Sequence, residues 1–99
     1  MPHIDFQKTA DVLPAAWVSR IIGQRGATRI KVPRMDQAYQ EEKHGFNEAR
    51  IVIDGRLELD VAGEAFSLAA GDMYRVQAGV PHAVRRGSHG SLPILDIAA

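Results

Sequence analysis

The second half of the chain alternates short β-prone runs with segments rich in turn-forming residues. The apolar-rich runs cover residues 49–53, 56–62, 64–70, 73–76, 82–86 and 93–98. The segments between them contain Gly, Asp, Pro or Ser. Short strands at this spacing are typical of an antiparallel sandwich or barrel. The pattern therefore predicts the all-β class.

The first half of the chain is less regular. Residues 1–12 lack periodicity and are expected to form an extended arm. Residues 15–22 and 28–32 lean towards β structure and flank a Gln-Arg-Gly segment, which favours a first hairpin. A helix over residues 10–22 is the alternative. Residues 35–47 are polar without period, which indicates a loop.

Local signals refine the strands and their faces. Asp54-Gly55 is typical of a two-residue hairpin turn, because both central positions of that turn need positive φ. Pro33 and Pro93 lie in strand-like runs, so these strands are edges or begin beside the proline. Period-two alternation places Arg50 on the same face as its second neighbours in sequence, Glu48 and Val52.

If that face points inward, Ile51 and Ile53 point outward and need a cover. The amino-terminal arm or a second subunit could supply it, and we expect a homodimer.

Composition limits the function. Ninety-nine residues make one small domain, so any site lies within it or between subunits. Twelve Lys plus Arg balance twelve Asp plus Glu, which gives no electrostatic case for nucleic acid or an anionic membrane. No cysteine is present, which leaves His, Asp and Glu as metal ligands. No apolar run could span a bilayer and the first residues lack a signal-peptide pattern, so a cytoplasmic location is expected.

Two turn-bounded stretches, residues 42–55 and 71–82, carry the residues best suited to chemistry, and together they resemble the paired motifs of the cupins. The matching positions are His44, Glu48 and Gly55 in the first stretch and Gly71, Gly79 and His82 in the second. Glu42 stands where the first histidine of the motif is usual, and Gln77 where a proline is usual. The resemblance covers roughly residues 27–97.

The resemblance implies an antiparallel double-stranded β-helix, or jelly-roll barrel, over residues 15–99, preceded by a short arm of residues 1–14. Cupins commonly dimerise, which agrees with the expected homodimer. The resemblance also implies metal ligation by His44, Glu48 and His82. Two imidazoles and a carboxylate suit Fe(II), Mn(II), Ni(II), Co(II) or Zn(II) and leave coordination positions open.

Glu42 leaves two readings open. It is either a further ligand, favouring harder ions such as Mn(II) or Fe, or a surface residue of an acidic run. Without metal, His44 and His82 would instead hydrogen-bond a ligand or act as acid and base. Arg50 would clamp a substrate carboxylate or form a salt bridge at the rim. Tyr74 would donate its hydroxyl to a ligand or pack in the core.

These residues support two functional hypotheses. In the first, a metal-binding cupin acts on a small polar or carboxylate-bearing molecule, with a dioxygenase or isomerase type of reaction. In the second, the barrel is a non-catalytic small-molecule-binding or sensor cupin without metal. The motif does not select the reaction, because the same fold and ligands serve several chemistries.

Overall fold

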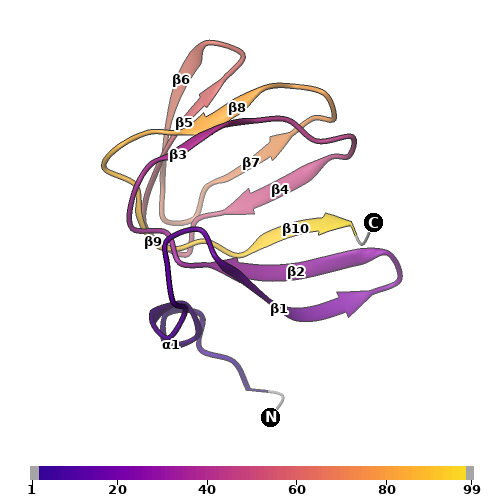
Figure 1. Ribbon diagram of the computed structural model, residues 1–99, viewed down its shortest axis with the longest axis vertical. Helices are drawn as coiled ribbons and strands as arrows, with labels where there is room; N and C mark the ends of the chain where they lie inside the picture. The colour runs from indigo at the N-terminus through magenta and orange to yellow at the C-terminus, as the bar shows by residue number, and fades with distance from the viewer. Residues whose placement is uncertain (1–2, 98–99) are drawn as a thin grey trace.

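The computed structural model describes residues 3–97, which form one short helix and ten strands (Figure 1). The elements are α1 (Phe6–Asp11), β1 (Ser19–Arg25), β2 (Thr28–Pro33), β3 (Tyr39–Glu42), β4 (Glu48–Ile51), β5 (Asp54–Val61), β6 (Glu64–Ala69), β7 (Met73–Val76), β8 (His82–Val84), β9 (His89–Ser91) and β10 (Ile94–Ile97). The six-residue α1 is too short to cross a membrane, and no other described helix could do so.

The strands form two antiparallel sheets that face each other. The first sheet has the order β1-β2-β10-β4-β7, and the second has the order β3-β8-β5-β6 with β9 paired to β5. The chain crosses from one sheet to the other several times, as between β4 and β5, whereas β1 and β2 pair within the first sheet and β5 and β6 within the second. This arrangement confirms the predicted all-β jelly-roll class.

A single apolar core fills the space between the sheets. Inward positions of both sheets supply it, because alternate side chains of a strand point to opposite faces. The buried members are Met35, Val52, Leu57, Leu59, Val61, Leu68, Val76, Val84, Leu92 and Ile94. The polar site described below occupies one end of this interior.

The first hairpin is confirmed as β1 and β2, and the helix over residues 10–22 is wrong. Residues 3–12 are not wholly extended either, since α1 forms within them. Asp5 caps the helix, because its side chain accepts a hydrogen bond of 3.0 Å from the backbone N–H of Lys8. Ala10 is 1% exposed, and α1 lies against β1, β2 and β9 of its own chain.

Three further sequence predictions need correction. The predicted loop of residues 35–47 contains β3, which pairs with β8. Asp54-Gly55 is not a hairpin turn, because it begins β5, and Gly55 pairs with Gly90 of β9. Pro33 ends β2, which lies inside its sheet between β1 and β10, whereas β10 begins directly after its proline, as predicted.

Candidate metal centre

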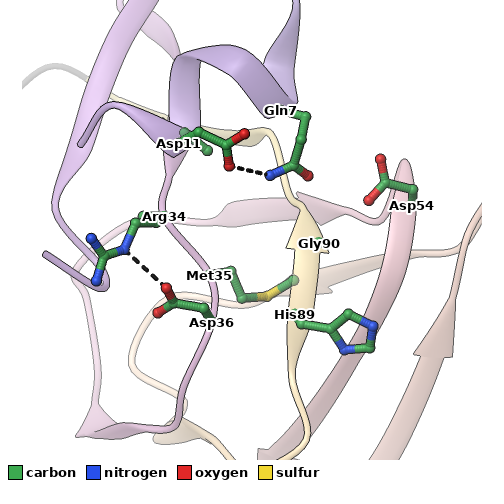
Figure 2. Close-up of a pocket in the computed structure, with 9 residues that line it drawn as sticks. Gln7, Asp11, Arg34, Met35, Asp36, Asp54, His89 and Gly90 are labelled. Carbon is green, nitrogen blue, oxygen red and sulfur yellow. Dashed lines mark hydrogen bonds and ion pairs between the residues drawn. The ribbon is translucent and has the colours of Figure 1, made fainter. Parts of the chain in front are cut away.

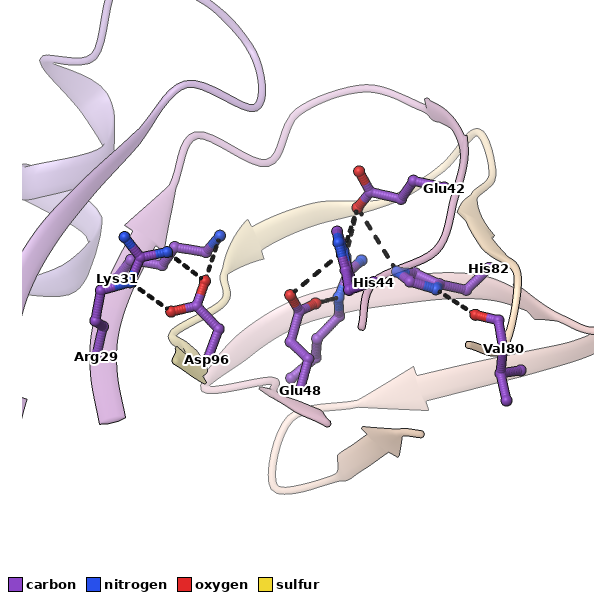
Figure 3. A network of polar contacts seen from close by, with 9 residues as sticks. Arg29, Lys31, Glu42, His44, Glu48, Val80, His82 and Asp96 are labelled. Carbon is purple, nitrogen blue, oxygen red and sulfur yellow. Dashed lines mark hydrogen bonds and ion pairs between the residues drawn. The ribbon is translucent and has the colours of Figure 1, made fainter. Parts of the chain in front are cut away.

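Strands β3, β4 and β8 bring four predicted site residues to one end of the barrel (Figure 3). Glu42 is the last residue of β3 and pairs with His82, the first residue of β8. Glu48 begins β4, where the buried positions alternate with partly exposed ones. His44 lies in the loop between β3 and β4, so the site is formed by this loop, its two flanking strands and the start of β8.

The most compact group in the site is Glu42, His44 and His82. Their ligand atoms all lie within 4.8 Å of one another. Glu42 Oε1 is 3.3 Å from His44 Nε2 and 3.6 Å from His82 Nε2. Both Nε2 atoms are buried, and neither makes a hydrogen bond within the described chain. Two buried nitrogens that face one carboxylate oxygen without hydrogen bonds match the donor set of a divalent metal.

The tautomer of His82 also fits a metal ligand. Its Nδ1 lies 3.0 Å from the backbone oxygen of Val80, which can only accept a hydrogen bond. In the neutral ring Nδ1 therefore carries the proton, and Nε2 presents its lone pair to the site. Metal-binding histidines are commonly oriented by such a bond from the second ring nitrogen.

Glu48 lies beside this group rather than within it. Its Oε2 is 3.6 Å from His44 Nε2, but its Oε1 accepts a 2.7 Å hydrogen bond from Nε of Arg50. Both Glu48 and Arg50 are nearly fully buried, at 2% and 3% exposure. The sequence grouped Glu48 with the two histidines, whereas in the structure Glu42 is the carboxylate closest to both.

Arg50 points inward and links the two carboxylates. Besides its bond to Glu48, its Nη2 donates to Glu42 Oε1 at 3.2 Å. The guanidinium carbon lies 5.9 Å from the centre of the Trp17 ring. Among the described residues, Nη1 is the one nitrogen of this guanidinium that is buried without a hydrogen-bond partner. Arg50 therefore has one nitrogen left to donate to a ligand, which does not support bidentate binding of a substrate carboxylate.

Tyr74 is opposite Arg50 in the register of β4 and β7, so the two residues lie on the same face of the sheet. The Tyr74 ring is 5.0 Å from the ring of Phe66, in a tilted arrangement at the edge of the core. This packing favours the reading as a core residue. The substrate-binding role remains a prediction.

A small cavity of about 120 Å³ opens on the cluster. Its lining consists of Trp17, Ser19, Lys31, Tyr39, Glu42, His44, Glu48, Arg50 and Ile94. The rings of Trp17 and Tyr39 lie 5.6 Å apart on its wall. Neither Lys31 nor Tyr39 was identified from the sequence as a site residue. Lys31 could have been found from its position between two apolar residues of a strand, Ile30 and Val32.

Lys31 belongs to a second ionic group beside the cavity, centred on Asp96 of β10 (Figure 3). Arg29 donates from Nε and Nη2 to the two carboxylate oxygens at 2.8 and 2.9 Å, and Lys31 Nζ lies 2.9 Å from Oδ2. Burial raises the pKa of Asp96, but the bonds from Arg29 and Lys31 outweigh it and hold the pKa below its usual value. Asp96 is therefore an anion at neutral pH.

A wider hollow of about 620 Å³ lies between α1 and β9 and shares no lining residue with the small cavity (Figure 2). Its polar side chains largely engage one another. Gln7 donates to Asp11 at 2.7 Å, Arg34 pairs with Asp36 at 3.0 Å, and Asp54 accepts from Ser91. These contacts explain the hollow as a packing seam between the helix and the barrel.

Comparison with known families decides the assignment of the chain. The family model described as a cupin domain matches residues 30–98, well over half of the sequence. The chain is a cupin. The resemblance of the two sequence motifs to this family is thereby confirmed.

Solved structures and one characterised relative agree with this assignment. A cupin-2 domain containing protein from Shewanella frigidimarina superimposes with a TM-score of 0.86 at 21% identity, over 98% of this chain and 96% of that chain. A protein from Neisseria meningitidis gives a TM-score of 0.80 at 20% identity, over 97% and 99%. At such identities these structures show the fold alone.

A quercetin 2,3-dioxygenase from Bacillus subtilis (strain 168) is 44% identical over 43 residues, which are 43% of this chain and 13% of the dioxygenase. The cupin therefore matches only a small part of that enzyme.

Proposed function

We propose that this cupin binds one divalent transition metal through Glu42, His44 and His82 and acts on a small polar or carboxylate-bearing molecule in the adjoining cavity. The observation that carries the proposal is the pair of buried Nε2 atoms of His44 and His82, which face Glu42 and have no hydrogen-bond partner among the described residues. Fe, Mn, Ni, Co and Zn all accept such ligands. A dioxygenase or isomerase type of reaction fits this family and donor set.

The charges around the site support a cation. Glu42 and Glu48 carry two negative charges and Arg50 carries one positive charge, so the group is negative overall when the histidines are neutral. A bound metal would supply a Lewis acid with open coordination positions. The chain would orient the two imidazoles, hold Glu42 near them through Arg50 and line the cavity with the Trp17 and Tyr39 rings.

A metal-free binding or sensor protein is the second candidate, and one contact favours it. Arg50 Nη2 already pairs with Glu42 Oε1, the oxygen that lies nearest both histidines. This guanidinium supplies in part the positive charge that a metal would bring. Nη1 of Arg50 and the imidazoles would then hydrogen-bond the ligand directly.

Metal content separates the two candidates. Protein purified without chelator is expected to carry about one transition metal per chain by elemental analysis, and His44→Ala is expected to carry almost none. Loss of a direct ligand should exceed the roughly 10- to 100-fold loss in metal affinity that follows removal of an outer partner. His89→Ala is the matched control, because His89 is exposed and lies outside the cluster. Wild-type protein that binds no metal in titration calorimetry would overturn the first candidate.

We also propose a homodimer in which a second copy covers the outer face of the first sheet. Met73 of β7 and Ile97 of β10 are 57% and 38% exposed, and Ile53, which follows β4, is 48% exposed. Sedimentation equilibrium is expected to give twice the mass of one chain, and Met73→Lys is expected to shift the equilibrium towards monomer, since it places a charge on the apolar face. A concentration-independent monomer in the wild type would contradict the dimer.

The division into an arm of residues 1–14 and a domain of residues 15–99 remains a prediction. So does the cytoplasmic location, which cell fractionation would check.

A further inference from the structure

Lys31 lies on the wall of the candidate metal centre without being one of its predicted ligands. It is on β2, where it pairs with Ile94 of β10, and its side chain is 23% exposed. It lines the same cavity as Glu42, His44 and Arg50. A lysine in this position needs an explanation, because ammonium groups are rarely placed in a barrel interior unless they are paired.

The pairing with Asp96 does not use up the charge of Lys31. Arg29 alone satisfies both oxygens of Asp96 with two charge-assisted bonds of 2.8 and 2.9 Å. Lys31 adds a second cation at 2.9 Å to the same carboxylate, so the three residues carry one positive charge in excess. An ammonium has three N–H donors, and Asp96 is its one ionic partner within residues 3–97. Donors and charge therefore remain for a ligand in the cavity.

We propose that Lys31 determines the specificity of the site by binding the carboxylate of a small organic acid, with Asp96 and Arg29 holding its ammonium in place. The inference rests on the proposed function, because the remainder of the ligand would reach the metal centre formed by Glu42, His44 and His82. The single excess positive charge of the group formed by Arg29, Lys31 and Asp96 matches the monoanion of a carboxylic acid better than the dianion of a phosphate. Arg50 takes no main part in this recognition, because Nε and Nη2 are already bound to Glu48 and Glu42.

The cavity also limits the size of the acid. A volume of about 120 Å³ is roughly that of four water molecules, at about 30 Å³ each in the liquid. A carboxylate with one or two further carbon or oxygen atoms fills this space, and a longer ligand would extend beyond the cavity. The substrate class is therefore a small carboxylic acid, or the carboxylate end of a longer one.

Chemical-shift titration with acetate and propionate tests the proposal on both the metal-free and the Zn(II)-loaded protein. Lys31→Met is expected to weaken acetate binding at least 10-fold while changing Zn(II) affinity less than 2-fold. The variant keeps the bond between Arg29 and Asp96, so a thermal melt should show a folded protein. Lys43→Met is the matched control, because Lys43 is exposed and next to the predicted ligands, and it should alter neither affinity. Acetamide, the neutral analogue, should bind wild type and Lys31→Met equally weakly.

The two proposals fail separately in this experiment. Normal Zn(II) binding with equal acetate affinity in wild type and Lys31→Met would overturn the role of Lys31 and leave the metal centre standing. If the protein does not bind Zn(II), but the metal-free protein binds acetate in a way that depends on Lys31, the metal centre would be overturned and the role of Lys31 would stand. Tighter binding of inorganic phosphate than of propionate would contradict the carboxylate class.

Discussion

Replacing Arg50 with leucine is expected to lower the free energy of unfolding of the metal-free protein by about 3–5 kcal/mol, the usual cost of removing one partner of a buried ion pair. Glu48 is 2% exposed and accepts its 2.7 Å bond from this guanidinium. Without Arg50 its carboxylate would stay buried without its cation. Glu42 would also lose a 3.2 Å contact.

Urea denaturation followed by circular dichroism measures this loss. Arg75→Leu is the control, since Arg75 is exposed on the neighbouring strand β7, and its change should stay within about 0.5 kcal/mol. The double variant Glu48→Gln with Arg50→Leu should recover part of the loss, because it removes the unpaired charge as well. Zn(II) should stabilise Arg50→Leu more than wild type if the metal replaces the missing positive charge. A fully stable single variant would show that the pair contributes little to folding.

The strands of the second half could be predicted from the sequence because each carries its own alternation and turn signals. The runs at residues 56–62, 64–70 and 73–76 became β5, β6 and β7 with shifts of at most two residues. β3 could not be found this way, because Tyr-Gln-Glu-Glu has no apolar alternation and forms a strand through its pairing with β8. The three-residue β9 was hidden in a segment that otherwise has the composition of a turn.

The part of the site that could be predicted is the part in which spacing along one strand determines where the side chains point. Glu48 and Arg50 are two residues apart on one strand, so their shared inward face followed from the pleat. Which carboxylate lies between the histidines did not follow, because it depends on how the loop at His44 folds back and on Arg50 holding both acids. Lys31 was missed for a related reason: its partner Asp96 lies on a strand at the other end of the sequence.

Substituting Gly55 with alanine is expected to destabilise the fold by about 2–5 kcal/mol. Gly55 has a φ of +81°, which costs an L-residue about 1–2 kcal/mol. A Cβ there would overlap the carbonyl oxygen of His89 and lie 2.8 Å from the Cα of Gly90, so β5 and β9 would have to separate. Overpacking of this kind adds about 1–3 kcal/mol. Gly90→Ala should cause a similar loss, because its Cβ would overlap the backbone oxygen of Asp54.

Gly63→Ala separates the steric effect from the backbone effect. Gly63 has nearly the same φ, +84°, but an added Cβ would meet nothing within 4 Å. It should therefore cost only the backbone strain of about 1–2 kcal/mol. Thermal unfolding of the three variants is expected to place Gly55→Ala and Gly90→Ala well below Gly63→Ala in melting temperature. Equal losses at Gly55 and Gly63 would show that positive φ alone matters at this motif glycine and that the close approach of β5 to β9 does not constrain the barrel.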